Sequence, residues 1–193
     1  MGGYADASAV HQHHGLVLSG SSVATVDFPG AKFTELLGIN YWGTIVGNYS
    51  SSTFYGPDAA FKLKNGVFTI LHYPGSTRTQ VGGISDKGVI VGNYTDNQSL
   101  QHGFVLANGI YTTLDNPNTN NGLTLPYDIN SSGAIVGVYS GLRSFIYING
   151  VFKDIAPSNS NATLVTGING YGYVTGTANF NDGSQASFTA HCQ

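Results

Sequence analysis

The sequence predicts an all-β fold, a four-bladed β-propeller with four-stranded antiparallel blades that is closed by N- and C-terminal strands. Three observations point to it: a segment that recurs four times, four strand-like stretches in each copy, and glycine turns between them. The segment is clearest in residues 83–94, and its isoleucine returns at intervals of 45, 45 and 39 residues, as Ile39, Ile84, Ile129 and Ile168. A repeat of this length indicates one supersecondary unit per copy, and such copies stack to bury a shared core.

The strand-like stretches fall into four types, called a to d, each short and rich in β-branched or aromatic residues. Type a covers residues 35–40, 80–85, 125–130 and 164–169. Type b covers residues 44–49, 89–94, 134–139 and 173–178. Type c covers residues 15–18, 60–63, 103–106, 144–148 and 187–190. Type d covers residues 23–27, 67–71, 110–114 and 151–155.

The turn residues support this division. Asn-Gly pairs join c to d at residues 65–66, 108–109 and 149–150, and Asn-Gly between apolar stretches is the strongest short-range hairpin signal. A glycine also ends each a-to-b turn, where it supplies a positive φ. A proline follows each d stretch and stops its pairing, at Pro29, Pro74, Pro117 and Pro157.

Repeated meanders around a ring hide nearly all sheet edges, which favours a propeller. Type c occurs five times, so we expect residues 23–27 to complete the blade that holds residues 164–190, and the c stretch near Leu16 is left without an assigned place. A β-trefoil and a β-prism favour three units and rank lower, and an open β-solenoid remains an alternative. We expect residues 13–193 to form the single propeller and residues 1–12 a flexible N-terminal tail.

Charge is scarce in this chain. Charged residues make up 9% of it, against about 25% in typical globular proteins. The seven Lys and Arg are scattered singly and the net charge is −3, so we expect no nucleic-acid partner. The single Cys192 allows no internal disulfide. No run approaches about 18 apolar residues, so we expect no membrane span.

Two features could hold an ion. His11, His13 and His14 are closely spaced, and neutral imidazoles at such spacing can bind a divalent ion. No second group of histidines or carboxylates completes a shell, so we predict no metal site and no cofactor. Asp128 stands where other copies have glycine, and it marks either an ion or water site or a hydrogen bond to a neighbouring backbone amide.

The repeated motif consists of Gly-Ile-Asn, a glycine turn, Ile-Val-Gly-X-Tyr, a Gly-Phe strand and an Asn-Gly turn. They occur in residues 38–49, 83–94, 102–117, 128–139 and 144–155. This pattern resembles the HAF-type repeat of bacterial extracellular repeat proteins, and with gaps it covers about residues 14–190. The resemblance implies a propeller-like fold and an extracellular or periplasmic location, but no catalytic residues. The fourth copy departs from it, with Ala178 in place of the tyrosine. Residues 1–6 lack the basic start and apolar stretch of a signal peptide, so we expect this start to replace a leader if the protein is exported.

Connections between strands indicate where a ligand would bind. In an up-and-down blade the a-to-b and c-to-d turns share one face of the ring, and the b-to-c and d-to-a connections share the other. The second set is longer and more varied, and function is concentrated on such loops. We therefore expect a ligand on this face, over the mouth of the central axis.

Several side chains suited to binding fall at that rim. Tyr49, Tyr94 and Tyr139 close b stretches; His14, His102 and Arg143 open c stretches; His72 and Asp115 close d stretches. The first hypothesis is a module that binds a glycan or another small polar ligand, with Tyr49, His72, Asp115 and Trp42 as ligand-binding residues. The alternative for the tyrosines is packing, with each ring between two sheets.

A second hypothesis is a lyase or isomerase that needs no cofactor. His102 or His14 would take a proton, Tyr139 or Tyr94 would give one, and Arg143 would stabilise a carboxylate or an enolate. β-Elimination on a uronic-acid glycan would suit these groups, whereas Glu35 is the only glutamate, which disfavours a two-carboxylate glycosidase. A third hypothesis is a structural surface repeat protein. The sequence leaves open whether the protein is an enzyme and what its oligomeric state is.

Overall fold

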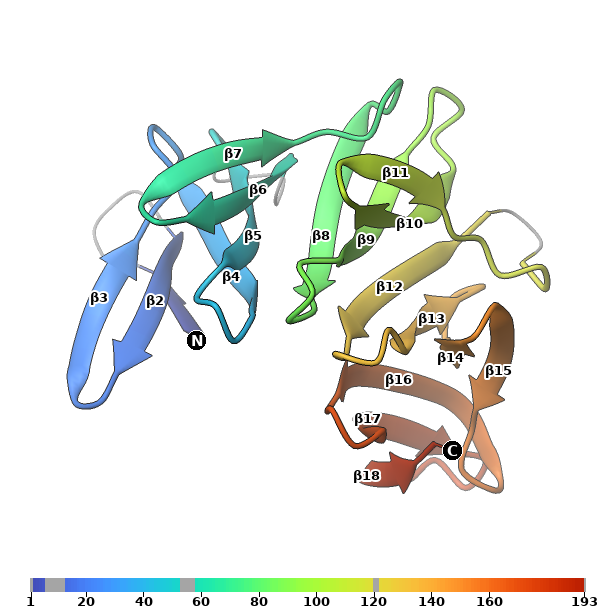
Figure 1. Cartoon of the computed structure of the whole chain (residues 1–193). Helices are drawn as coiled ribbons and strands as arrows, with labels where there is room; N and C mark the ends of the chain where they lie inside the picture. The colour runs from blue at the N-terminus through green and yellow to red at the C-terminus, as the bar shows by residue number, and fades with distance from the viewer. Residues whose placement is uncertain (1, 6–12, 53–57, 120–121, 193) are drawn as a thin grey trace.

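The computed structural model describes residues 2–5, 13–52, 58–119 and 122–192. Within these ranges the chain is all-β, without a helix, and its strands form four antiparallel sheets arranged as the blades of a four-bladed β-propeller (Figure 1). The predicted fold class is confirmed. No helix in these ranges therefore has the length and apolar character to cross a bilayer.

The second, third and fourth sheets are meanders of strands in chain order, whereas in the first sheet the third strand pairs only with the second. The first sheet contains β1 (Gly2–Ala5), β2 (His13–Ser19), β3 (Ser22–Val26), β4 (Phe33–Ile39), β5 (Ile45–Ser50), β6 (Ala59–Lys64) and β7 (Val67–Leu71). The second contains β8 (Arg78–Ile84), β9 (Ile90–Thr95), β10 (Gln101–Ala107) and β11 (Ile110–Thr113). The third contains β12 (Thr124–Ile129), β13 (Ile135–Tyr139), β14 (Arg143–Ile148) and β15 (Val151–Ile155). The fourth contains β16 (Ser160–Ile168), β17 (Tyr173–Phe180) and β18 (Gln185–His191).

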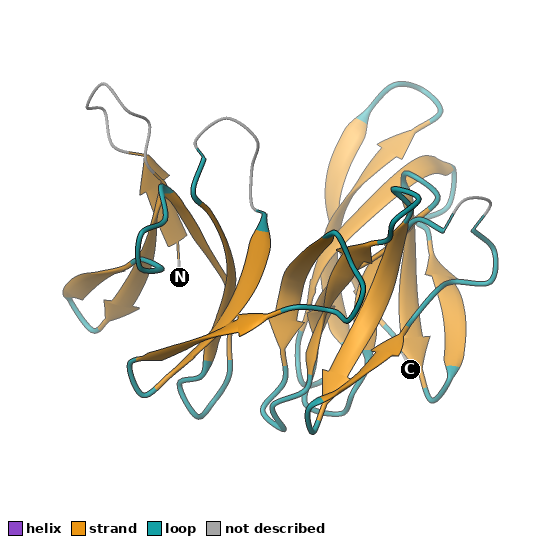
Figure 2. Cartoon of the chain, turned by 90° about the horizontal axis from the view of Figure 1, so that it is seen from above, coloured by secondary structure: helices purple, strands orange, loops and turns teal. Residues whose placement is uncertain are grey.

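The short turns and the longer connections lie on opposite sides of the ring, as predicted (Figure 2). The Asn-Gly hairpins form as expected, because Asn65, Asn108 and Asn149 have φ angles of 51°, 52° and 52° and each is followed by a glycine of positive φ. Such angles at both central residues define the type I′ turn, whose twist matches that of the strands it joins.

The N-terminus departs from the prediction. Gly2–Ala5 form β1, which pairs antiparallel with β2, so a flexible tail is wrong for these residues; residues 1 and 6–12 lie outside the described ranges. Tyr4 is opposite His14 in this ladder, just as Tyr94 is opposite His102 in the second sheet. Tyr4 therefore extends the series of tyrosines spaced by 45 residues, and β1 is a b-type strand.

The last blade is also built differently. β3 was expected to complete it, but β3 pairs with β2, and a single bridge between His13 and Phe33 links β2 to β4. The fourth sheet therefore has three strands, with β18 at its edge. The pairing of β3 with β2 closes a turn of only two residues, which costs far less chain entropy than pairing with a strand more than 150 residues away.

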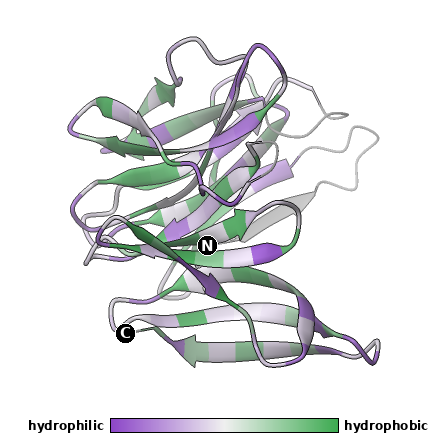
Figure 3. Ribbon diagram, turned by 90° about the vertical axis from the view of Figure 1, so that its right-hand side faces the viewer, coloured by the Kyte–Doolittle hydropathy of each residue, from purple (hydrophilic) through white to green (hydrophobic). Residues whose placement is uncertain are grey.

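Apolar side chains from neighbouring sheets form the core, and hydrophobic segments recur along the strands of every sheet (Figure 3). One valine of the b strand is fully buried in each of the four sheets: Val46, Val91, Val136 and Val174. Phe61, Phe104 and Phe145 are fully buried in the c strands of the first three sheets. These positions repeat with the sequence, so the first three copies contribute the same two residues to the core, and the fourth contributes the valine.

The a-type strands β4, β8, β12 and β16, called the inner strands below, each contain a β-bulge at the same place. The register against the neighbouring strand shifts between Leu36 and Gly38, Val81 and Gly83, Pro126 and Asp128, and Val165 and Gly167. The extra residues are Leu37, Gly82, Tyr127 and Thr166. A bulge leaves its extra residue out of the ladder and re-aims its side chain, and bulges are frequent next to functional sites.

Side chains tie successive sheets together through backbone groups. The Asn48 amide donates to the Val81 carbonyl oxygen at 3.2 Å, and the Val81 N–H donates to Asn48 Oδ1 at 2.9 Å. The Ser144 hydroxyl oxygen accepts the Val165 N–H at 2.9 Å. Buried polar groups need such partners, so these residues help to fix how the blades are set around the axis.

Candidate functional site

A cavity of about 430 Å³ lies where the inner strands of the four sheets come together. All four bulge residues line it, one from each sheet: Leu37, Gly82, Tyr127 and Thr166. Gln101 also lines it and directly follows the connection between β9 and β10. The cavity is therefore on the side of the ring that carries the longer connections, where the sequence predicts a ligand.

The polar groups of this axial cavity are mostly carboxamides. Gln80, Asn93 and Gln101 line it from three successive strands of the second sheet. In the described part of the chain, no residue hydrogen-bonds the side-chain amides of Asn93 and Gln101. A carboxamide offers both donors and an acceptor, so these two groups can pair with hydroxyls in either direction.

Apolar groups face these amides across the cavity. Leu37, Leu125 and Leu164 line it from the first, third and fourth sheets. Tyr127 is half-buried, and burial raises the pKa of its phenol, so its hydroxyl stays protonated and can donate. Apolar walls with a few polar groups are typical of small-molecule sites.

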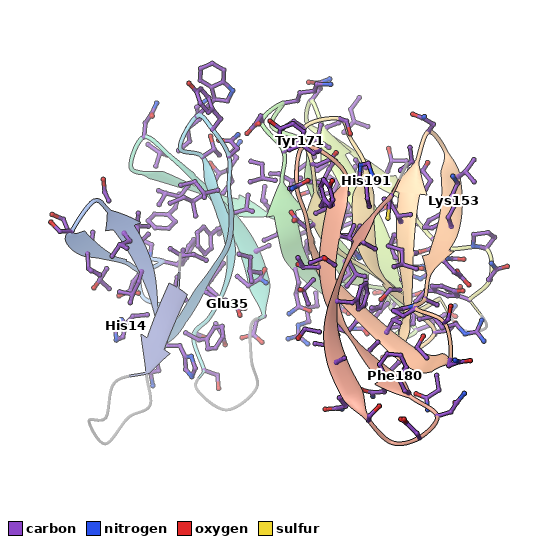
Figure 4. All side chains as sticks on the ribbon, turned by 90° about the horizontal axis from the view of Figure 1, so that it is seen from below. His14, Glu35, Lys153, Tyr171, Phe180 and His191 are labelled. Carbon is purple, nitrogen blue, oxygen red and sulfur yellow. The ribbon has the colours of Figure 1, made fainter. Side chains whose placement is uncertain are left out.

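One carboxyl group belongs to the same inner register. Glu35 is opposite Asn48 in the ladder of the first sheet, as Gln80 is opposite Asn93 in the second. Glu35 lies on the side of the first sheet nearer the other sheets (Figure 4). Burial raises the pKa of this carboxyl, and the nearby His13 lowers it by less. Glu35 therefore places an acidic group beside the axis that the sequence did not assign to any site.

None of the nine predicted site residues lines the axial cavity. The structure does bring three of them together: the His102 Nδ1 lies 2.7 Å from Asp115 Oδ2, and the Tyr94 ring stacks on the imidazole with centroids 5.1 Å apart. The other ring nitrogen, Nε2, lies 3.5 Å from Asp96 Oδ2. Both ring nitrogens of His102 thus face carboxylates of its own sheet, which anchors the connection that contains Asp96.

His14 forms a second pair of the same kind rather than joining His102. Its Nδ1 lies 2.7 Å from Asp27 Oδ2, and Figure 4 places His14 on the first sheet. The expected convergence of His14, His102 and His72 on one rim is not found. His14 and His102 each pair with an aspartate of their own sheet, and His72 directly follows β7 of the first sheet. His11 of the possible metal cluster lies outside the described residues, and no group of three His, Cys, Asp or Glu within them could hold a metal ion.

The predicted tyrosines pack within the fold. Tyr139 is only 1% exposed and donates its hydroxyl to Asp154 Oδ1 at 2.7 Å, so the prediction that it lies open at the rim is wrong. Tyr49 stacks on Phe28 at 3.7 Å, and Tyr94 stacks on Tyr73 at the same distance. The packing alternative therefore describes these rings.

Two further predicted residues lie apart from the cavity. Arg143 is exposed and lines a smaller hollow of about 220 Å³ between the third and fourth sheets, together with Asp154. Trp42 lies in the turn between β4 and β5, which is on the opposite face of the ring from the longer connections.

The His102 cluster predicts a pH-dependent stability. Burial lowers the pKa of His102, but the hydrogen bond and charge of Asp115, helped by Asp96, raise it above 6.5 overall. A histidine whose pKa is raised by folding adds stability that is complete below its unfolded pKa and is lost as pH rises through the folded pKa. The free energy of unfolding should therefore fall from pH 6 to pH 8.5 relative to that of His102→Asn, measured by urea denaturation. A difference between the two proteins that is constant with pH would contradict this role.

Comparisons with known proteins give a likeness of fold alone. No family model matches the chain, and no curated protein matches it. Among solved structures it is similar to a mutant of AofleA from Arthrobotrys oligospora, with 11% sequence identity and a TM-score of 0.44. The match covers 94% of this chain and 62% of the AofleA chain, so this chain spans less than two thirds of the length of AofleA. The resemblance to the HAF-type repeat stays a prediction.

The cavity residues had one weak signal in the sequence. Gln80, Leu125 and Leu164 open the a stretches at one register, and Gly82, Tyr127 and Thr166 follow two positions later. These positions vary from copy to copy, whereas a threonine precedes the first position in every copy and a glycine follows the second in every copy but the third. Variation at a fixed register of a repeat marks a position that the shared core does not use, and that signal points toward the axis.

Proposed function

We propose that this protein is an exported binding module that holds a glycan or another small polar ligand in the axial cavity. The observation that carries the proposal is the convergence of the four bulge residues on one cavity. Among the described residues, the side-chain amides of Asn93 and Gln101 in this cavity have no hydrogen-bond partner. A saccharide has an apolar face of C–H groups and an edge of hydroxyls. Leucine and tyrosine side chains suit the first, and carboxamides suit the second.

The alternative of a lyase or isomerase has less support from the geometry. His102 and Tyr139 belong to different sheets, and the Tyr139 hydroxyl is already bonded to Asp154. A general acid must reach the proton acceptor of the substrate within hydrogen-bonding distance. The other candidate acid, Tyr94, does stack on His102. Its hydroxyl lies 3.1 Å from Thr113 Oγ1, however, and both ring nitrogens of His102 already face carboxylates. Binding without turnover is therefore favoured.

The test is a screen on an array of neutral and acidic oligosaccharides, followed by calorimetric titration of the saccharides that bind. Tyr127→Ala and Gln101→Ala should each weaken binding about tenfold, which corresponds to the loss of about 1.4 kcal/mol of contact. Tyr171→Ala and Gln98→Ala are matched controls, because both residues are exposed and neither lines the cavity. We expect the controls to bind as the wild type does.

Three results would count against the proposal. Unchanged affinity in Tyr127→Ala and Gln101→Ala would place the ligand elsewhere. A steady appearance of unsaturated product from a uronic-acid oligosaccharide, followed by its ultraviolet absorbance and abolished by His102→Ala, would favour the lyase. No binding to any saccharide on the array would leave the structural repeat protein as the better description.

A further inference from the structure

The opposite face of the ring presents an exposed indole in a fixed orientation. Trp42, the only tryptophan of the chain, is 69% exposed. Its ring Nε1–H nevertheless donates to the Asp86 carbonyl oxygen at 3.1 Å, across to the turn of the second sheet. The Tyr41 N–H donates to Asp86 Oδ1 at 2.8 Å, and the Tyr41 ring meets the indole edge-on at 5.2 Å. An aromatic ring that is already ordered loses little further entropy when a ligand stacks on it.

A hollow of about 400 Å³ lies beside this indole. Two ammonium groups belong to residues that line it: Lys64, the last residue of β6, and Lys87, from the turn between β8 and β9. Within the described residues neither lysine forms an ion pair. The chain has only seven Lys and Arg, so two at one hollow are a local concentration of positive charge.

The carboxylate in the hollow is already committed to the fold. Asp86 Oδ2 accepts the Ser131 hydroxyl at 2.5 Å, while Oδ1 accepts the Tyr41 N–H. These two hydrogen bonds, that of Ser131 first, lower the pKa of Asp86, so it remains ionised and braces three turns. One carboxylate against two ammonium groups leaves the hollow with a net positive charge.

We propose that this hollow, called the turn-face site, binds an acidic sugar unit. The apolar face of a uronic-acid ring would stack on Trp42, and its carboxylate would lie between Lys64 and Lys87. Stacking on an indole and pairing with an ammonium each favour such a ligand, because aromatic rings present a broad apolar face and lysine pairs with carboxylates as a mobile point charge. The site is separate from the axial cavity, which lies on the other face of the ring and is lined by different residues.

The single tryptophan makes the test specific. Saturated trigalacturonate should change the fluorescence of Trp42 in a saturable way, and a neutral trisaccharide of the same length should bind at least about tenfold more weakly. Lys64→Gln combined with Lys87→Gln should weaken trigalacturonate about tenfold or more, and added salt should weaken the wild type in the same direction. Lys153→Gln, which changes an ammonium on the third sheet, is the matched control and should have no effect.

The outcomes separate this site from the axial one. Tyr127→Ala should leave the fluorescence titration unchanged, whereas Trp42→Ala should abolish trigalacturonate binding at this site as measured by calorimetry. Equal affinity for the neutral trisaccharide, insensitivity to the double lysine change, or no saturable signal up to about 10 mM would overturn the proposal. Loss of the signal in Tyr127→Ala alone would assign the saccharide to the axial cavity instead.

Discussion

Replacing Gly92 by alanine is expected to lower the free energy of unfolding by about 3 kcal/mol or more. A Cβ at this position would lie 2.1 Å from the Gln80 carbonyl oxygen and 2.8 Å from the Val81 Cα. Both are backbone atoms of the inner strand β8, which cannot move aside as a flexible side chain can. Overpacking in a well-packed core costs typically 1–3 kcal/mol, and a clash with a bulged strand that lines the axis exceeds the usual case.

The measurement is urea denaturation of Gly92→Ala beside Gly170→Ala. A Cβ added at Gly170 would meet no atom within 4 Å, and this glycine has no left-handed φ, so the same substitution there should change stability by no more than about 0.5 kcal/mol. Similar losses of stability at the two glycines would show that the destabilisation of Gly92→Ala does not come from the close approach of the β8 backbone to Gly92.

The same contact explains why a glycine recurs at this position in every copy of the repeat. Gly47, Gly137 and Gly176 would place a Cβ at 2.1, 2.2 and 2.4 Å from the carbonyl oxygen of the inner strand in their own sheets. The glycine in each Val-Gly or Thr-Gly pair is therefore the counterpart of the bulge opposite it. The sequence shows that glycine recurs. The carbonyl that excludes a side chain belongs to the residue 12 positions earlier, on the paired inner strand, and only the structure reveals this contact.

What the sequence predicts well is local. The hairpins at Asn65, Asn108 and Asn149 follow from two adjacent residues whose backbone preferences are intrinsic. The assignment of four strand types follows from the repeat, because each copy must solve the same packing problem. The two faces of the ring follow in turn, since alternate connections of a meander lie at opposite ends of its strands.

What the sequence does not predict is which polar groups on different strands and loops pair with each other. From the sequence, Tyr139 is predicted to offer a free hydroxyl, but in the structure this hydroxyl bonds to Asp154. Likewise His102 is predicted to be a free base, but its ring nitrogens face Asp115 and Asp96. Conversely, Asn93 and Gln101 read as ordinary surface amides. They become site candidates only when the bulges bring the inner strands around a cavity, and a bulge has no reliable sequence signal.

Replacing Asp128 by alanine is the second large effect that we expect, a loss of about 2–4 kcal/mol of stability. Of the two roles that the sequence left open for Asp128, the hydrogen bond to a neighbouring amide is confirmed. Oδ1 accepts the Ile129 N–H at 2.8 Å, and Oδ2 accepts the Ile168 N–H of the next inner strand at 2.9 Å. Removing the acceptor of a buried donor costs about 1–3 kcal/mol. Alanine at position 128 removes the acceptor of two backbone N–H groups, those of Ile129 and Ile168.

A series of substitutions tests whether the expected loss of stability comes from the hydrogen bond of Asp128 to Ile168, which joins the third and fourth sheets. Asp128→Asn keeps one acceptor and removes a charge whose burial raises the pKa of the carboxyl, so it should be milder than alanine. Asp182→Ala is the matched control, because that carboxylate also accepts a backbone N–H, from Ser184 at 2.9 Å, but in an exposed turn. The amide of Ile168 should exchange faster with solvent in Asp128→Ala than global unfolding alone explains. Unaltered protection of that amide would mean that the sheets are held together by their apolar contacts, with Asp128 adding nothing.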